Sequence, residues 1–192
     1  MKTHFKLAVA AIILANSSLS VKAQTEAKSE SIKEIIYSAG VESGLTSGSI
    51  REAYKWSLGG SLQAATPVTR NIFVTVNAGY QNYFKDDNAR FPAKADIRLI
   101  AGKAGLKYFP LNSFYVQAEA GADFLLNKSE TGLQRTTAFV YAPQMGYQFK
   151  LSGMSYLDTG VRYERTTNFN EDLNSSKVNS YVLRLAYAFL LK

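Results

Sequence analysis

Residues Tyr181–Leu191 read YVLRLAYAFLL, and this stretch near the C-terminus decides the fold. Every second residue from Tyr181 to Leu191 is a bulky aliphatic or aromatic residue, whereas the residues between them include Arg184, Ala186 and Ala188. Successive side chains of a strand point to opposite faces, so this period of two predicts a β-strand with one strongly apolar face. A helix would need apolar residues at steps of three and four, which the stretch lacks.

The same alternation recurs upstream, in segments separated by residues that favour turns. The predicted strands cover about 34–44, 54–63, 72–81, 95–109, 114–124, 139–149, 157–164 and 181–191. The block 95–109 is the least regular, which predicts a β-bulge near Ala101. Short turns at 66–70, 110–113 and 152–155 alternate with longer polar connections at 45–52, 85–94, 127–134 and 166–179. This layout predicts an all-β fold, an antiparallel up-and-down transmembrane β-barrel of about eight strands over residues 34–192.

The two faces of the predicted strands differ in chemistry. One face is aliphatic and aromatic, with Tyr, Phe and Trp near strand ends, where such rings sit at the headgroup level of a membrane. The opposite face is small and polar and carries both signs of charge, and we expect it to form the barrel interior. The predicted interior network comprises Glu42, Lys55, Gln117, Glu119, Asp123, Asp158, Arg162, Glu164 and Arg184. Side chains fill a barrel of about eight strands, so general porin activity is not expected.

The first residues predict a secretory leader. Lys2 and Lys6 precede the apolar run 7–15, and the segment Val21–Ala23 places small residues just before a cleavage position after Ala23. A run of about nine residues is too short for a membrane-spanning helix, which needs about 20. We therefore expect a signal peptide at 1–23, a short periplasmic lead-in at 24–33 and a mature chain located in the outer membrane.

Composition removes many classes of function. The chain has no Cys, and its single His, His4, lies in the predicted leader, so neither a Ser-His-Asp triad nor a His-ligated or Cys-ligated zinc site is expected. The net charge of +7 includes Lys2, Lys6 and Lys22, which leaves +4 on the mature chain without basic blocks. Nucleic-acid binding is not expected from such a pattern. No catalytic, cofactor or metal site is predicted.

Two stretches resemble known outer-membrane proteins. Arg184, Ala186, Phe189 and Leu191 match the C-terminal assembly signal of outer-membrane barrels, with Ala186 where Gly is usual. Residues 104–109 and 114–121 resemble the central hairpin of small outer-membrane β-barrel domain proteins of the Bacteroidetes type, which are similar in architecture to the OmpA and OmpX barrels. The resemblance implies that the chain meets the barrel assembly machinery, outer-membrane lipid and lipopolysaccharide, and it carries over no catalytic residues.

Four functions remain open on the sequence. The preferred one is a non-enzymatic barrel whose extracellular loops act in envelope structure or surface interaction, with an unknown loop ligand. A soluble lipocalin-like barrel would instead turn its aromatic face inward around an apolar ligand. A lipid-modifying enzyme would have to use carboxylates such as Glu119 and Asp123, which lie about 13 Å apart along one strand. A narrow channel would need a gap between the interior charges.

Overall fold

The computed structural model describes residues 35–90, 93–132, 134–169 and 177–191 of the chain. The predicted signal peptide at 1–23 and the lead-in at 24–33 therefore lie outside the described residues. Within the described ranges, no helix has the length and apolar character needed to cross a membrane.

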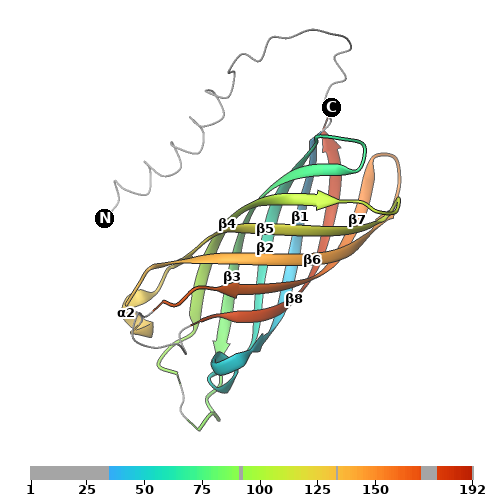
Figure 1. Cartoon of the computed structure of the whole chain (residues 1–192). Helices are drawn as coiled ribbons and strands as arrows, with labels where there is room; N and C mark the ends of the chain where they lie inside the picture. Colours follow the sequence, from blue (N-terminus) through green and yellow to red (C-terminus); the bar gives the residue numbers. More distant parts are fainter. Residues whose placement is uncertain (1–34, 91–92, 133, 170–176, 192) are drawn as a thin grey trace, which may run out of the picture. The chain divides into compact units, whose positions relative to one another are not determined.

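Eight antiparallel strands make up nearly all of the described chain. They are β1 (Ile35–Ser47), β2 (Tyr54–Pro67), β3 (Ile72–Lys85), β4 (Ile97–Tyr108), β5 (Phe114–Leu125), β6 (Thr137–Lys150), β7 (Ser155–Thr166) and β8 (Asn179–Leu191). Each strand pairs with its neighbours in sequence, and β1 also pairs with β8, from Ile35 opposite Leu191 to Ser47 opposite Asn179. The sheet therefore closes into an up-and-down barrel, as predicted (Figure 1).

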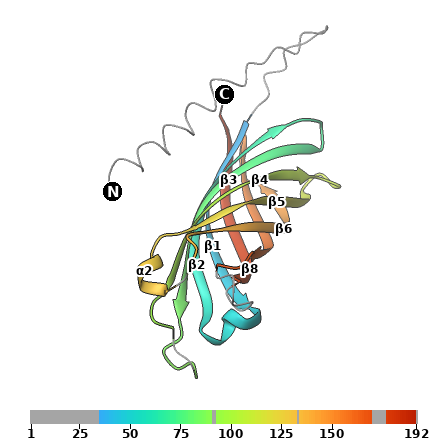
Figure 2. The ribbon, with the colours of Figure 1, turned by 60° about the vertical axis from the view of Figure 1, so that its left-hand side comes forward.

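Connections of two kinds lie at opposite ends of the barrel. The short turns 68–71, 109–113 and 151–154 share one end with the start of β1 and the end of β8. The longer connections share the other end, which carries the 3-10 helix η1 (Gly48–Glu52) and the short helix α2 (Lys128–Thr131), as Figures 1 and 2 show. We call these the turn end and the loop end.

The register of the barrel corrects one prediction. The bulge expected near Ala101 is wrong, because β4 pairs without interruption with β3 and β5 and alternates regularly from Ile97 to Lys107. The inward residues of β4 change from Ile97 and Leu99 at the loop end to lysines further along. In the sequence, this switch from apolar to charged residues looks as if the apolar residues had moved to the other side of the strand. The register instead shifts between Tyr54 and Trp56, at the start of β2.

The barrel is polar inside and apolar outside. Residues such as Gln63, Asn77 and Glu119 are buried within it, whereas Leu62, Val76 and Leu183 are more than half exposed on its outer surface. The aromatic side chains of β6 and β8, including Tyr147 and Tyr187, also face outward. A lipocalin-like barrel requires the opposite arrangement, so the structure contradicts that alternative.

Glycines bring β4 and β5 close together. A Cβ atom at Gly121 would lie 1.9 Å from the carbonyl oxygen of Gly102 and 2.7 Å from the Cα of Lys103. Glycine at such a position lets the neighbouring backbone approach and the strand bend into the barrel wall. A Cβ atom at Gly102, on the outer face of β4, would meet nothing within 4 Å.

We predict that Gly121→Val forces β4 and β5 apart and destabilises the barrel by at least about 2 kcal/mol. Urea unfolding of the chain refolded into lipid vesicles would measure the loss. Gly102→Val is the matched control and should leave the unfolding midpoint near that of the wild type. Equal unfolding midpoints for the two variants would show that the close approach at Gly121 does not contribute to the stability of the barrel.

Candidate functional site

An ionic network centred on Arg162 crosses the middle of the barrel interior. Its Nη2 donates to Glu42 Oε2 at 2.6 Å, and its Nε lies 2.9 Å from Glu164 Oε1. Glu164 also pairs with Lys103 from β4, so the network joins β1, β4 and β7. Arg162 is only 1% exposed and reaches from β7 past β8 to Glu42 on β1. A buried charge that lacks an oppositely charged partner strongly destabilises a fold, so each of these buried groups needs its partner.

Arg184 from β8 extends this network toward the turn end. Its Nε donates to Ser61 Oγ at 3.1 Å and its Nη2 donates to Ser38 Oγ at 3.0 Å. The same guanidinium lies 3.5 Å from Glu42 Oε1 and 3.8 Å from Asp158 Oδ1. Arg184 therefore connects carboxylates on β1 and β7, the two strands that flank β8.

A second cluster surrounds Asp158 on β7. Lys107 Nζ donates to one of its oxygens at 2.9 Å, and the Tyr115 hydroxyl donates to the other at 2.6 Å. Gln148 Nε2 donates to Asp158 at 2.8 Å, and Gln144 Nε2 donates to the Tyr115 hydroxyl at 2.6 Å. Lys107 also lies over the Tyr115 ring, 3.9 Å from its centroid, which adds a cation–π contact.

The remaining predicted interior residues occupy the same core. Glu119 accepts a hydrogen bond from Thr75, and Gln117 donates to Gln63. Asp123 is buried and lines a cavity with Lys103 of only about 10 Å³, which is the size that holds one water. Side chains therefore fill the barrel at this level.

Lys55 is the one member of the predicted network that the structure places elsewhere. Its side chain is 64% exposed on the outside of the barrel, and it pairs with Asp86 at 2.5 Å. The register shift between Tyr54 and Trp56 is the physical reason. Tyr54 consequently turns inward, although the alternation predicted it to face lipid. The Lys55 ammonium, by its hydrogen bond, holds the pKa of the Asp86 carboxyl below its usual range.

Two interior cations, Lys103 and Lys107, were missed by sequence reasoning. They are 4% and 3% exposed, and they supply partners for Glu164 and Asp158. With them, the buried charged residues number five carboxylates and four cations in the described chain, which nearly neutralise each other. Strict alternation through β4 would have found both lysines, because they share a face with Ile97 and Leu99.

An apolar plug closes the loop end of the barrel. It is defined by the buried residues Ile50, Tyr54, Tyr83, Ile97, Leu99, Leu125, Ala138, Phe169 and Val178. Ile50 belongs to η1, and Phe169 and Val178 belong to the connection between β7 and β8. Phe169 is completely buried, although it lies in the connection 166–179, which is long and polar in the sequence.

Hydrogen bonds tie the long connections to one another. The Tyr54 hydroxyl donates to Ala95 O at 2.8 Å, and Asn127 Nδ2 donates to Asp96 O at 2.7 Å. Arg135 N donates to Phe169 O at 2.9 Å. These contacts link the β3–β4, β5–β6 and β7–β8 connections over the plug, and they hold the loop end as one surface.

The residues of the predicted assembly signal have different environments. Arg184 and Ala186 point inward and are 1% exposed, whereas Phe189 faces outward and packs against Tyr37 and Tyr187 at ring-centroid distances of 6.3 Å and 5.9 Å. Leu191 pairs with Ile35 at the start of β1. Their role in assembly stays a prediction.

Comparison with solved structures finds small outer-membrane barrels. The outer membrane protein AlkL, solved in lipid bilayers, has a TM-score of 0.55 at 17% identity, covering 90% of this chain and 97% of its own. Neisserial surface protein A gives 0.55 at 18% identity, covering 82% and 96%, and Ail, the attachment invasion locus protein of Yersinia pestis, gives 0.52 at 17%, covering 82% and 99%. No protein-family model and no curated protein matches the chain. At these identities the likeness supports the fold.

We predict that Arg162→Met destabilises the folded barrel by about 3–5 kcal/mol, because it leaves Glu42 and Glu164 buried beside an apolar side chain. The urea unfolding midpoint in vesicles would measure this change. Lys55→Met is the matched control, since it removes an ion pair at the exposed rim, and its midpoint should stay close to the wild-type value. A midpoint for Arg162→Met that equals the control would argue against the network as a determinant of stability.

Proposed function

We propose that the chain is a non-enzymatic integral protein of the outer membrane that presents its loop end as a surface for interaction outside the cell. The observation that carries the proposal is the division of the barrel into three zones. The outer surface is apolar, the interior is filled by an ionic network, and the plug fastens the long connections.

Several features support a location in the outer membrane. The strands contain 12 to 14 residues, and a tilted strand needs about 9–11 to cross the hydrocarbon core. A closed barrel also satisfies every backbone group within the wall, as hydrocarbon requires. The solved structures that it resembles are outer-membrane proteins. Cleavage after Ala23, and the Bacteroidetes type of the barrel, remain predictions from the sequence.

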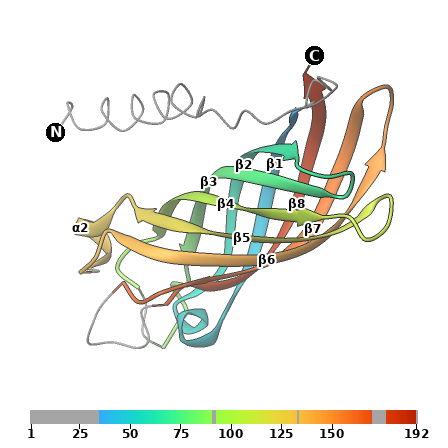
Figure 3. The same ribbon diagram turned by 45° about the horizontal axis from the view of Figure 1, so that its top comes forward.

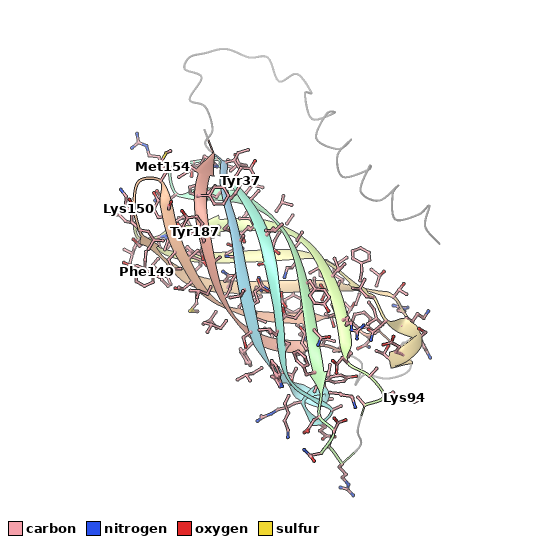
Figure 4. All side chains as sticks on the ribbon, turned by 180° about the vertical axis from the view of Figure 1, so that it is seen from behind. Tyr37, Lys94, Phe149, Lys150, Met154 and Tyr187 are labelled. Carbon is pink, nitrogen blue, oxygen red and sulfur yellow. The ribbon has the colours of Figure 1, made fainter. Side chains whose placement is uncertain are left out.

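The loop end offers the chemistry of a binding surface. Arg51, Lys94 and Lys128 are exposed there, and Asp87 is exposed beside its partner Lys85. Figure 4 places Lys94 at the end of the barrel opposite Tyr37 and Met154. Because the plug holds the connections in place, these charges form a preorganised surface, which lowers the cost of ordering them on binding.

The interior favours a structural role over transport or catalysis. The cavities at the levels of Arg162 and Asp158 measure about 10 Å³ each, which leaves room for single waters and not for a permeating solute. Glu119 and Asp123 are both buried within the wall-to-wall network, away from any lipid that an enzyme would have to reach. We therefore expect no lipid turnover and negligible ion conductance.

The proposed topology predicts a difference between the two ends in intact cells. The chain has no Cys, so a single Cys is a clean reporter. Asn88→Cys, in the β3–β4 connection, should react with a membrane-impermeant maleimide, whereas Asn112→Cys, in a short turn, should react only after lysis. Equal labelling of both in intact cells, or a protein found in the soluble periplasm, would contradict the proposal.

The surface role predicts an effect of loop charges that leaves folding unchanged. The triple variant Arg51→Ser, Lys94→Ser and Lys128→Ser should lower attachment of expressing cells to one another and to solid supports. Its band should still shift between unboiled and boiled samples on a gel. Arg70→Ser with Lys150→Ser, at the turn end, is the control and should attach like the wild type. Normal attachment by the triple variant would refute the surface role and leave the barrel assignment intact.

A further inference from the structure

An apolar groove is cut into the outer surface of the barrel across β1, β2 and β3, with Phe189 of β8 at its edge. It has a volume of about 380 Å³ and is lined by side chains of Tyr37, Ala39, Leu62, Ala64, Val76, Ala78 and Phe189, with the backbone of Ser38 and Gln63 beneath. The side chains of Ser38 and Gln63 are buried on the inner side of the wall, so the groove and the interior network lie on opposite sides of the same strands.

Strand pairing produces the groove by placing small residues between large ones. In one row Tyr37 lies opposite Ala64, which lies opposite Val76. In the adjacent row Ala39 lies opposite Leu62, which lies opposite Ala78. Leu62 and Val76 are 65% and 60% exposed, so they project beside the alanines and form walls around a low floor.

An aromatic group marks the turn-end limit of the groove. The Phe189 ring packs against Tyr37 at 6.3 Å and against Tyr187 at 5.9 Å. Figure 4 shows Tyr37 and Tyr187 near the end of the barrel that carries the β6–β7 turn, with Lys150 and Met154. Tyrosine rings concentrate where hydrocarbon meets headgroups, which locates the groove in the leaflet on the turn side.

We infer that this groove binds one acyl chain of a phospholipid from the inner leaflet of the outer membrane. The inference rests on the proposed membrane location. The groove opens on the surface that faces hydrocarbon, and an unfilled hollow there would lose the dispersion contacts of its lining. The lining carries no charged side chain, so it suits the tail of a lipid and not its headgroup.

The size of the groove favours an acyl chain over a second copy of the protein as its occupant. A stable interface between two proteins buries about 800 Å² per partner and involves about 20–30 residues on each side. The groove is formed by seven side chains on four strands, which is enough for one flexible chain. Tyr37, which lines the groove, carries a hydroxyl that can donate a hydrogen bond to an ester or phosphate oxygen of the same lipid.

Filling the floor of the groove tests the inference. The chain would be refolded in vesicles of phosphatidylethanolamine and phosphatidylglycerol, extracted in mild detergent and weighed intact by native mass spectrometry. The wild type should retain one phospholipid per barrel. Ala64→Leu with Ala78→Leu should reduce the retained fraction about tenfold, because leucine side chains would occupy the space of the acyl chain.

A matched variant and the gel shift distinguish failure of the inferred lipid site from failure of the proposed membrane location. Ala120→Leu with Ala122→Leu places the same change on β5, on the outer face and outside the groove, and should retain lipid like the wild type. Equal retention in both double variants, no retained lipid in the wild type, or a mass corresponding to two barrels would overturn the inference. Loss of the heat-dependent gel shift in the wild type would instead contradict the membrane location itself.

Discussion

The pairing of β1 with β8 is the constraint on which the rest of the structure depends. Thirteen residue pairs join the two strands, and they remove the free edges that an open sheet would expose. Once the sheet is closed, every strand must send alternate side chains to an enclosed interior and to an outer surface. Figure 3 shows the continuous wall that results. Closure therefore forces a choice of which chemistry lies inside, and this chain encloses its charges.

Enclosed charges explain why the interior is filled instead of open. Arg162 and Arg184 each contact more than one acidic or hydroxyl side chain, and the resulting network spans strands that are far apart in sequence. An aqueous pore would solvate these groups separately, whereas here they pair largely with one another, and only some atoms, such as Glu119 Oε2, lack a hydrogen-bond partner among the described residues. The apolar plug at the loop end completes the separation, because it excludes water from the side of the network that faces the long connections.

The sequence predicted the fold well because strand alternation and turn chemistry are local signals. It predicted eight of nine interior residues at positions that the structure buries inside the barrel. Lys55 failed because one register shift at Tyr54 reverses the faces, and pairing with β3 decides that shift. Lys103 and Lys107 were missed because the apolar Ile97 and Leu99 on the same face of β4 suggested a change of face near Ala101. The burial of Phe169 could not be predicted from the sequence, because it depends on contacts between loops in the plug.

The register of the strands also sets the shape of the outer surface, which bears on function. Its large side chains are not uniformly distributed: leucine, valine and tyrosine surround alanines over β1, β2 and β3, so the outer wall is hollowed there. Alternation in the sequence reveals that a residue lies on the outer face, but only the register shows that Ala64 lies between Tyr37 and Val76. A barrel whose interior is filled can still differ from similar barrels in the shape of its outer surface and in its loop end. The two surfaces lie on different parts of the barrel, because the plug closes the loop end and the groove lies on the outer wall beside Tyr37, toward the turn end.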